Sequence, residues 1–143
     1  MSGVPSVDPN DRRAEAARWL AFAVDDMGIL DACLTKYEPS LGGAAYHCQQ
    51  AAEQIIKGLM IAAGVAFPYT HDLVALGDVA LIHYPEHRNV FLRLGPLTFW
   101  STAFRYPSSN PLANDPPDTD EIEAALADVK LLTTALRDIT APT

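Results

Sequence analysis

The fold is decided by residues 41–64, which read LGGAAYHCQQAAEQIIKGLMIAAG. Apolar residues recur here in steps of three and four, the spacing that lines one face of an α-helix. They are Ala45, Cys48, Ala52, Ile55, Leu59 and Ala62. The helix is expected to run from about Leu41 to Ala63 and to stop at Gly64, since glycine suits a left-handed C-terminal cap. The stretch therefore predicts a long helix with one buried face.

Nearly opposite that face lies a polar one, formed by Tyr46, Gln50, Glu53 and Lys57. At 100° per residue these four side chains fall within roughly 60° of one another. One interpretation is a solvated stripe, in which Glu53 and Lys57 form an ordinary ion pair worth about 0.3–0.5 kcal/mol. The other is a surface presented to a partner subunit or a ligand. Spacing alone favours the solvated stripe.

Four more helices are expected around this one. The first begins at Asp8-Pro9, an N-cap followed by proline at the first helical position, and runs to about Lys36. A shorter helix, capped by Thr70, runs from His71 to about His83. The next covers about 86–104, and Pro96 should kink or split it because proline lacks an N–H and its ring clashes with the preceding turn.

The last helix should open at Asp118, which with Glu121 resembles a capping box, and end at about Ile139. Residues 107–118 contain four prolines and are read as a loop. Apolar stripes mark the first and last helices. On the first helix the stripe consists of Leu20, Val24, Met27, Leu30 and Leu34. On the last helix it consists of Ile122, Leu126, Val129, Leu132, Leu136 and Ile139. Four long helices plus one short helix predict an all-α, up-and-down bundle.

Length and composition fit one globular domain. The 143 residues are 49% hydrophobic and 20% charged, so residues 1–143 are read as a single domain, ordered over about 8–140. Cys33 and Cys48 fall in apolar helical segments, which favours reduced thiols over disulfides or zinc ligands. The N-terminus does not resemble a signal peptide, and the apolar stretch 58–67 is too short to cross a bilayer. A cytoplasmic protein without membrane contact is the expectation.

Charge constrains the ligand. The net charge of −8 argues against holding DNA or RNA by bulk electrostatics, which requires Lys and Arg to neutralise phosphates. Residues 87–114 nevertheless contain no acid and carry +3 from Arg88, Arg93 and Arg105, which leaves −11 on the rest of the chain. This segment is either a cationic surface or simply a stretch whose apolar residues leave few positions for acids.

Three segments resemble the signatures of the HEPN family, in the same order. They are AAYHCQQAAEQIIKGL at 44–59, FPYTHDL at 67–73 and RYP at 105–107. The likeness extends from about Ala14 to Leu136. It implies a small helical bundle that usually dimerises, a partnership with a minimal nucleotidyltransferase, and a role in nucleotide or RNA chemistry.

The catalytic branch of that family cuts RNA without metal, using an arginine and a histidine separated by four to six residues. Here Arg105 is followed, after four residues, by Asn110, whose amide has no usable protonation change. All four histidines precede Arg105, and His71 is the one that could approach it in space. If the chain is a catalyst, Arg105 and His71 are its candidates, and the missing motif histidine disfavours ribonuclease activity.

The resemblance also suggests which side chains would contact a nucleotide or RNA: Arg105, Tyr106, Asn110, His71, Glu53 and Lys57. Structural interpretations stand beside these. A cation such as Arg105 is favoured at a helix C-terminus by the dipole alone, Tyr106 can pack into the bundle, and His71 can serve the start of its helix. No cofactor is implied. No metal is expected either, because inward Glu-x-x-His pairs are absent.

Three functions remain. The preferred one is a non-catalytic nucleotide-binding or interaction module that forms a homodimer and works with a minimal nucleotidyltransferase. The second is an RNA-cleaving toxin of a toxin–antitoxin system. The third is a structural dimerisation protein without a ligand.

Overall fold

A computed structural model describes residues 2–101 and 115–142. Three long α-helices, two short ones, two 3₁₀ segments and a two-stranded sheet make up this part of the chain. In chain order they are β1 (Ser2–Gly3), α1 (Pro9–Thr35), α2 (Leu41–Ala62), β2 (Phe67–Pro68), α3 (Leu73–His83), η1 (Pro85–His87), α4 (Arg88–Leu94), η2 (Gly95–Ser101) and α5 (Thr119–Thr140). The predicted all-α bundle is confirmed.

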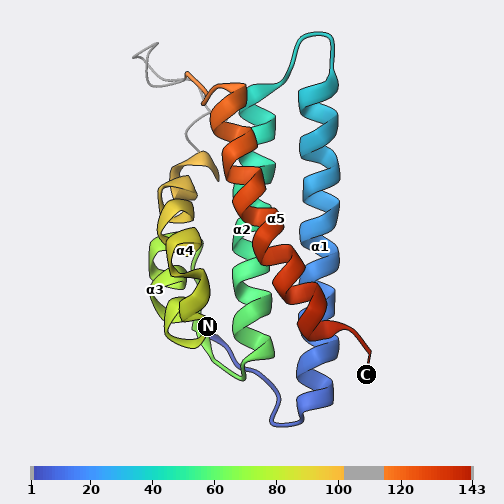
Figure 1. Ribbon diagram of the computed structural model, residues 1–143, viewed down its shortest axis with the longest axis vertical. Helices are drawn as coiled ribbons and strands as arrows, with labels where there is room; N and C mark the ends of the chain where they lie inside the picture. The colour runs from blue at the N-terminus through green and yellow to red at the C-terminus, as the bar shows by residue number, and fades with distance from the viewer. Residues whose placement is uncertain (1, 102–114, 143) are drawn as a thin grey trace.

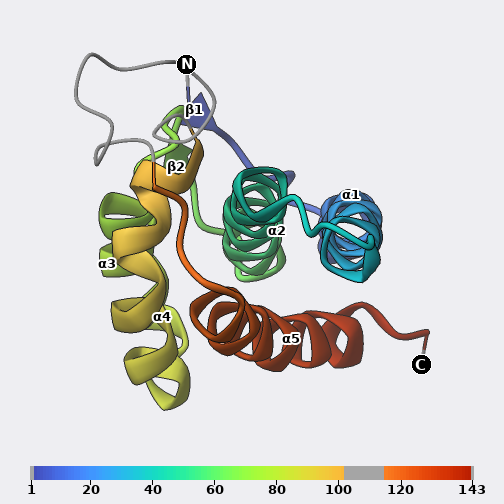
Figure 2. The same ribbon diagram turned by 90° about the horizontal axis from the view of Figure 1, so that it is seen from above.

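Helix α2 lies at the centre of the bundle. Figure 1 shows α1 and α2 side by side and antiparallel, with α5 crossing them diagonally, and Figure 2 shows α3 and α4 stacked on the other side of α2. Strand β1 pairs antiparallel with β2, so that Gly3 faces Phe67 next to the start of α3. In the described ranges, no helix is both long and apolar enough to cross a membrane.

Local sequence signals set most helix ends where they were expected. Asp8 caps α1 by accepting a hydrogen bond from the Asn10 N–H at 2.8 Å, and Gly64 has the left-handed φ of 74° that follows α2. Asp118 and Glu121 form both hydrogen bonds of a capping box at the start of α5. Asp8 and Asp118 satisfy N–H groups, and the turn at Gly64 satisfies carbonyl groups, that a helix end leaves without internal partners.

Two helix predictions were wrong in detail. Asp72, not Thr70, caps α3: its carboxylate accepts hydrogen bonds from the N–H groups of Val74 and Ala75, and the helix begins at Leu73 rather than at 71. The helix predicted from residue 86 becomes α-helical only at Arg88, after the 3₁₀ segment η1. Its predicted split at Pro96 is confirmed, since α4 ends at Leu94 and 3₁₀ geometry follows over Gly95–Ser101, the last described residues of that helix. Pro96 accounts for that change, because its ring and missing N–H disrupt α-helical bonding.

The core is built around α2, in which 14 of 22 residues are buried, while α1 buries only Ala16, Ala23 and Leu30. These three are spaced by seven residues, and Val24, predicted to be in the stripe, is exposed. The stripe predicted on α5 is buried except for Ile139. At Ala16, α1 approaches α2 closely, since a Cβ atom on Gly58 would lie 3.6 Å from the Ala16 carbonyl oxygen.

Cys48 lies in this core as a free thiol. Burial, and secondarily the charge of Asp128, raises its pKa to about 12, so the thiol stays protonated at neutral pH. Tyr84 is fixed to the same helix, since its hydroxyl donates a 2.6 Å hydrogen bond to the Leu59 carbonyl. That bond joins the end of α3 to the last turns of α2.

Candidate functional site

The polar face of α2 is not the solvated stripe that spacing favoured. Glu53 and Lys57 are only 5% and 4% exposed. Gln49, a polar residue one turn before Glu53, is fully buried as well. The Lys57 Nζ lies 3.0 Å from Glu53 Oε2. A buried ion pair loses the hydration of both charges, so it persists only where further partners satisfy them. The surrounding residues supply those partners.

The Glu53 carboxylate accepts hydrogen bonds from three side chains. Besides Lys57, its carboxylate accepts the Gln49 amide at 3.3 Å and the His71 ring nitrogen Nδ1 at 2.9 Å. Gln50 in turn donates to the Gln49 carbonyl oxygen at 2.7 Å. We call Gln49, Glu53, Lys57 and His71 the Glu53 cluster. It joins three positions on α2 to the residue that precedes the cap of α3.

Aromatic rings enclose the lysine of this cluster. The Lys57 ammonium lies 5.9 Å from the Trp19 ring centre, 5.5 Å from Phe67 and 5.7 Å from Tyr69. Each ring face attracts the cation and also excludes water from it. Three elements contribute: α1 through Trp19, β2 through Phe67, and the turn after β2 through Tyr69. The N-terminal strand holds β2 in this place.

His71 is the part of the cluster that reaches solvent. Its side chain is 72% exposed, whereas that of Glu53 is 7% exposed. An ionised carboxylate only accepts hydrogen bonds, so the contact with Glu53 assigns a hydrogen to Nδ1 and turns Nε2 toward solvent. Nε2 has no partner among the described residues. It can accept a proton or, once protonated, donate to an anion.

The exposed ring of Tyr69 lies beside the same ion pair. Tyr69 thus contacts the lysine of the ion pair, and His71 contacts the glutamate. Nucleotide sites combine these two kinds of group, an aromatic platform for stacking and a hydrogen-bonding group for phosphate or sugar. Sequence reasoning missed Tyr69, Gln49, Trp19 and Phe67. The four-residue step from Gln49 to Glu53 was a usable signal, but nothing local tied Trp19 to this site.

Three predicted contact residues, Arg105, Tyr106 and Asn110, lie outside the described residues. Glu53, Lys57 and His71 are brought together, whereas Tyr46 stays further along α2, with its ring against His47 at 5.0 Å between centres. Over residues 2–101 and 115–142, no group of three or more His, Cys, Asp or Glu side chains could hold a metal ion.

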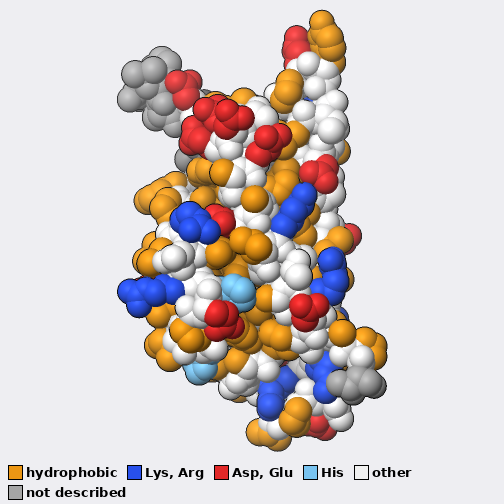
Figure 3. Space-filling model, in the orientation of Figure 1, with side chains coloured by type: hydrophobic (Ala, Val, Ile, Leu, Met, Phe, Trp, Pro, Cys, Tyr) orange, Lys and Arg blue, Asp and Glu red, His pale blue; other side chains and the backbone are white. Residues whose placement is uncertain are grey.

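One of the three arginines in the acid-free segment 87–114 is neutralised by an acid from another helix. Arg93 forms two hydrogen bonds with the Asp128 carboxylate of α5, at 2.9 and 2.8 Å. These bonds, and then the charge of Asp128, raise the pKa of Arg93 above its usual value. On the face in Figure 3, Lys and Arg side chains are scattered, and acids gather near the start of α5. Arg93 therefore joins α4 to α5 through an ion pair and stabilises the bundle.

The protein is therefore an all-α bundle in which Glu53 orients an exposed histidine, His71. The HEPN domain family model matches residues 34–139, from the end of α1 through nearly all of α5, and the chain belongs to this family. The family is one of modules that interact with nucleotides or RNA. No curated protein matches the chain, and no solved structure does.

Proposed function

We propose that this HEPN domain is a non-catalytic module that binds nucleotides or RNA at the surface formed by His71 and Tyr69. The observation that carries the proposal is the His71–Glu53 contact, which holds an exposed imidazole on the buried ion pair, while the exposed Tyr69 ring lies over Lys57, the other member of that pair. A nucleobase stacks on Tyr69 while His71 bonds to a phosphate or hydroxyl group. Arg105, Tyr106 and Asn110 are further proposed contacts, by their match to the family signature.

The protein's charge shapes the affinity. With a net charge of −8, long-range attraction of phosphate is weak, so binding depends on short-range contacts more than on counterion release. A hydrogen bond to a charged group contributes about 1.5–3 kcal/mol, and stacking on an aromatic ring contributes about 1–3 kcal/mol per base. A mononucleotide or a short single strand therefore fits better than a long duplex.

Calorimetric titration with nucleoside mono- and triphosphates tests the site. His71→Ala and Arg105→Ala should each weaken binding by roughly 10- to 150-fold, as the energy of one charged hydrogen bond implies. His83→Ala is the control for His71, because His83 is also exposed and its side chain makes no hydrogen bond or ion pair with the described residues. Equal binding by wild type and both site variants would remove the assignment.

Tyr69→Ala should weaken binding by about 5- to 150-fold if the ring stacks on a base. Tyr37, fully exposed just beyond the end of α1, is the matched control. A loss in Tyr69→Ala but not in Tyr37→Ala supports stacking. A similar loss in both variants indicates non-specific contact and contradicts the proposal.

One observation favours a second candidate, the metal-independent ribonuclease. A carboxylate that fixes the hydrogen on Nδ1 leaves Nε2 as a base that can take the proton of a ribose 2′-hydroxyl, a step usually worth about 10²–10⁴-fold in rate. We still expect no cleavage of RNA in chelator-treated buffer, because Asn110 cannot act as an acid or a base. Specific cleavage that both His71→Ala and Arg105→Ala abolish would replace the binding proposal.

The partners follow from the family resemblance. We propose a homodimer and an interaction with a minimal nucleotidyltransferase. Large apolar side chains exposed on the outer side of α1, Phe22 and Ile29, support a further interface. Light scattering that shows a monomer at micromolar concentration would exclude the homodimer. A dimer that binds no nucleotide would instead support the structural dimerisation protein.

A further inference from the structure

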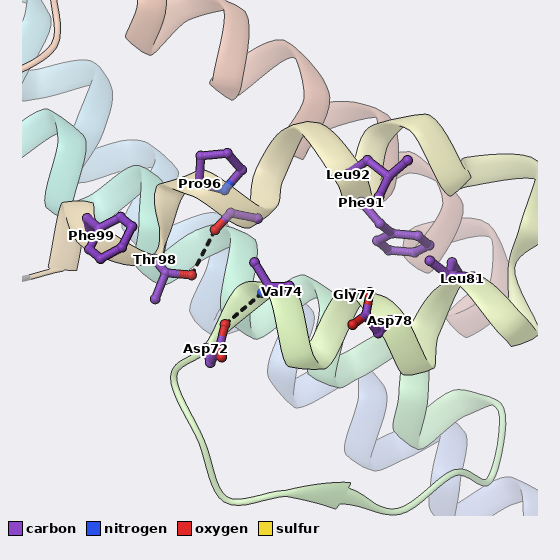
Figure 4. Close-up of a pocket in the computed structure, with 11 residues that line it drawn as sticks. Asp72, Val74, Gly77, Asp78, Leu81, Phe91, Leu92, Pro96, Thr98 and Phe99 are labelled. Atoms are coloured by element: carbon purple, nitrogen blue, oxygen red, sulfur yellow. Dashed lines mark hydrogen bonds between the residues drawn. The ribbon is translucent and has the colours of Figure 1, made fainter.

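A groove runs between α3 and the α4–η2 layer, on the side of the bundle away from α1 (Figure 4). Its volume is about 810 Å³. Side chains from both layers line it, and most are apolar: Val74, Leu81, Phe91, Leu92, Pro96 and Phe99. Val74, Leu92 and Phe99 are exposed. The free protein therefore leaves a concave apolar surface in water, a feature typical of binding sites.

Close approach of the two layers shapes the floor of the groove. A Cβ atom on Gly95 would lie 3.0 Å from the Val74 Cγ2, and one on Gly77 would lie 3.5 Å from the Phe91 Cβ. These glycines let η2 and α4 rest on α3 without filling the space between them. The trough follows α3, whose 11 residues span roughly 16 Å.

The polar groups facing the groove are acceptors. The Thr98 hydroxyl is already used, since it donates to the Gly95 carbonyl at 2.8 Å and accepts the Leu73 N–H at 3.0 Å. Asp72 uses one carboxylate oxygen to cap α3. The Asp78 carboxylate makes no hydrogen bond or ion pair with any described residue. What remains for a ligand is two negative charges beside an apolar floor.

This chemistry excludes most occupants. A nucleotide or another anion would be repelled by Asp72 and Asp78, so the groove differs in kind from the His71 surface. A second copy seated here in a two-fold dimer would bring the same two acids to the shared interface, where like charges oppose each other. The groove instead complements an apolar surface that carries cations.

We propose that the groove is the docking site for an amphipathic α-helix of a partner protein, with large apolar anchors flanked by Lys or Arg. A helix laid in a groove places anchors at positions i, i+3 or i+4 and i+7. Asp72 and Asp78 both line the groove and lie roughly 9 Å apart along α3, close to the roughly 10.8 Å that two helical turns span. Cations two turns apart on the partner can therefore meet both acids.

Synthetic peptides of about 15 residues test the docking, since that length sustains a helix once it is bound. One carries leucines on one face with flanking lysines, and its counterpart has glutamates in place of the lysines. Fluorescence anisotropy should show binding of the lysine peptide and at least about tenfold weaker binding of the glutamate peptide. Equal affinity for the two peptides would overturn the proposal.

Two variants and two matched controls locate the site. Asp78→Lys and Leu92→Gln should each weaken binding of the lysine peptide by about tenfold or more. Asp25→Lys on α1 and Leu131→Gln on α5 should leave it unchanged; Leu92 and Leu131 are 53% and 55% exposed, so the two leucine variants are comparable. Equal weakening by the controls means non-specific attraction to an acidic protein and refutes the docking site.

Methyl NMR distinguishes a bound helix from the other possible occupants of the groove. Bound peptide should shift the methyl signals of Val74, Leu81 and Leu92 and leave Leu131 unaffected. Three outcomes overturn the proposal: shifts confined to the α1–α5 side, saturation of the groove by a short alkylamine as tightly as by the peptide, or self-association of the free protein that Leu92→Gln abolishes. The last two would identify a small cationic amphiphile or a second copy as the occupant.

Discussion

Replacing Lys57 with methionine removes the cation of the buried ion pair while keeping a side chain of similar length among Trp19, Phe67 and Tyr69. Breaking a buried pair by deleting one partner typically costs 3–5 kcal/mol, because the remaining charge is left without compensation. Glu53 keeps two donors in the variant, from Gln49 and His71. We therefore expect a loss near the lower limit, about 3 kcal/mol.

For a chain of this size, each kcal/mol shifts Tm by roughly 2–4 °C, so Lys57→Met should melt about 6–12 °C lower than wild type. Urea unfolding followed by circular dichroism gives the free energy directly. Lys130→Met, at an exposed lysine of α5, is the control and should be nearly neutral. The double variant Glu53→Gln with Lys57→Met should recover part of the loss, since no uncompensated charge remains.

A loss below about 1 kcal/mol for Lys57→Met would refute this reasoning, because that is the value of a solvated ion pair. It would mean that water reaches Glu53 and Lys57 and that the stripe interpretation was correct. Equal destabilisation of the single and double variants would also contradict it. In that case the cost would come from packing against the aromatic rings.

Three further measurements probe the bundle. Gly58→Ala should destabilise the protein by about 1–3 kcal/mol in the urea assay, because the added Cβ would lie 2.7 Å from the Leu136 Cδ2. Gly28→Ala should stabilise α1 by about 0.5–1 kcal/mol in the same assay, because the Cβ added there would have no neighbouring atom within 4 Å. The raised pKa of Cys48 means that the folded state holds the thiol proton more tightly than the unfolded chain. The contribution of Cys48 to the unfolding free energy should therefore be constant below about pH 9 and decrease toward pH 12, so the fall over that range should be less steep in Cys48→Ala. Asp118→Ala should lower stability by about 1 kcal/mol through loss of the capping box, and an unchanged Tm would contradict that role.

Local signals were sufficient to predict the bundle and most of its helix ends. Asp8, Gly64 and Asp118 act within one turn of their own position, so neighbouring residues alone reveal them. The error at Thr70 has the same origin. Two candidate caps stand two residues apart, and Asp72 prevails because its carboxylate reaches two amides, while the Thr70 hydroxyl bonds to Asp72 itself.

Burial of the α2 polar face could not be predicted in the same way. Whether Glu53 and Lys57 meet water depends on Trp19, Phe67 and Tyr69, which lie 10 or more residues away in the chain and arrive only through tertiary packing. Helical spacing describes one helix by itself. It identified which side chains share a face, but not what would cover that face.

The central place of α2 has a consequence for native-state hydrogen exchange. Its amides are surrounded by other helices, so we expect them to exchange only through global unfolding, as the most protected part of a protein does. Helices α3 and α4 and the segment η2 are short and carry several exposed apolar side chains, so their amides should exchange faster than those of α2. His71 stands where these two regions meet. A partial opening of the outer layer would thus take the imidazole away from Glu53 while α2 stays folded, so the fraction of molecules with an assembled site can be read from exchange rates at α3.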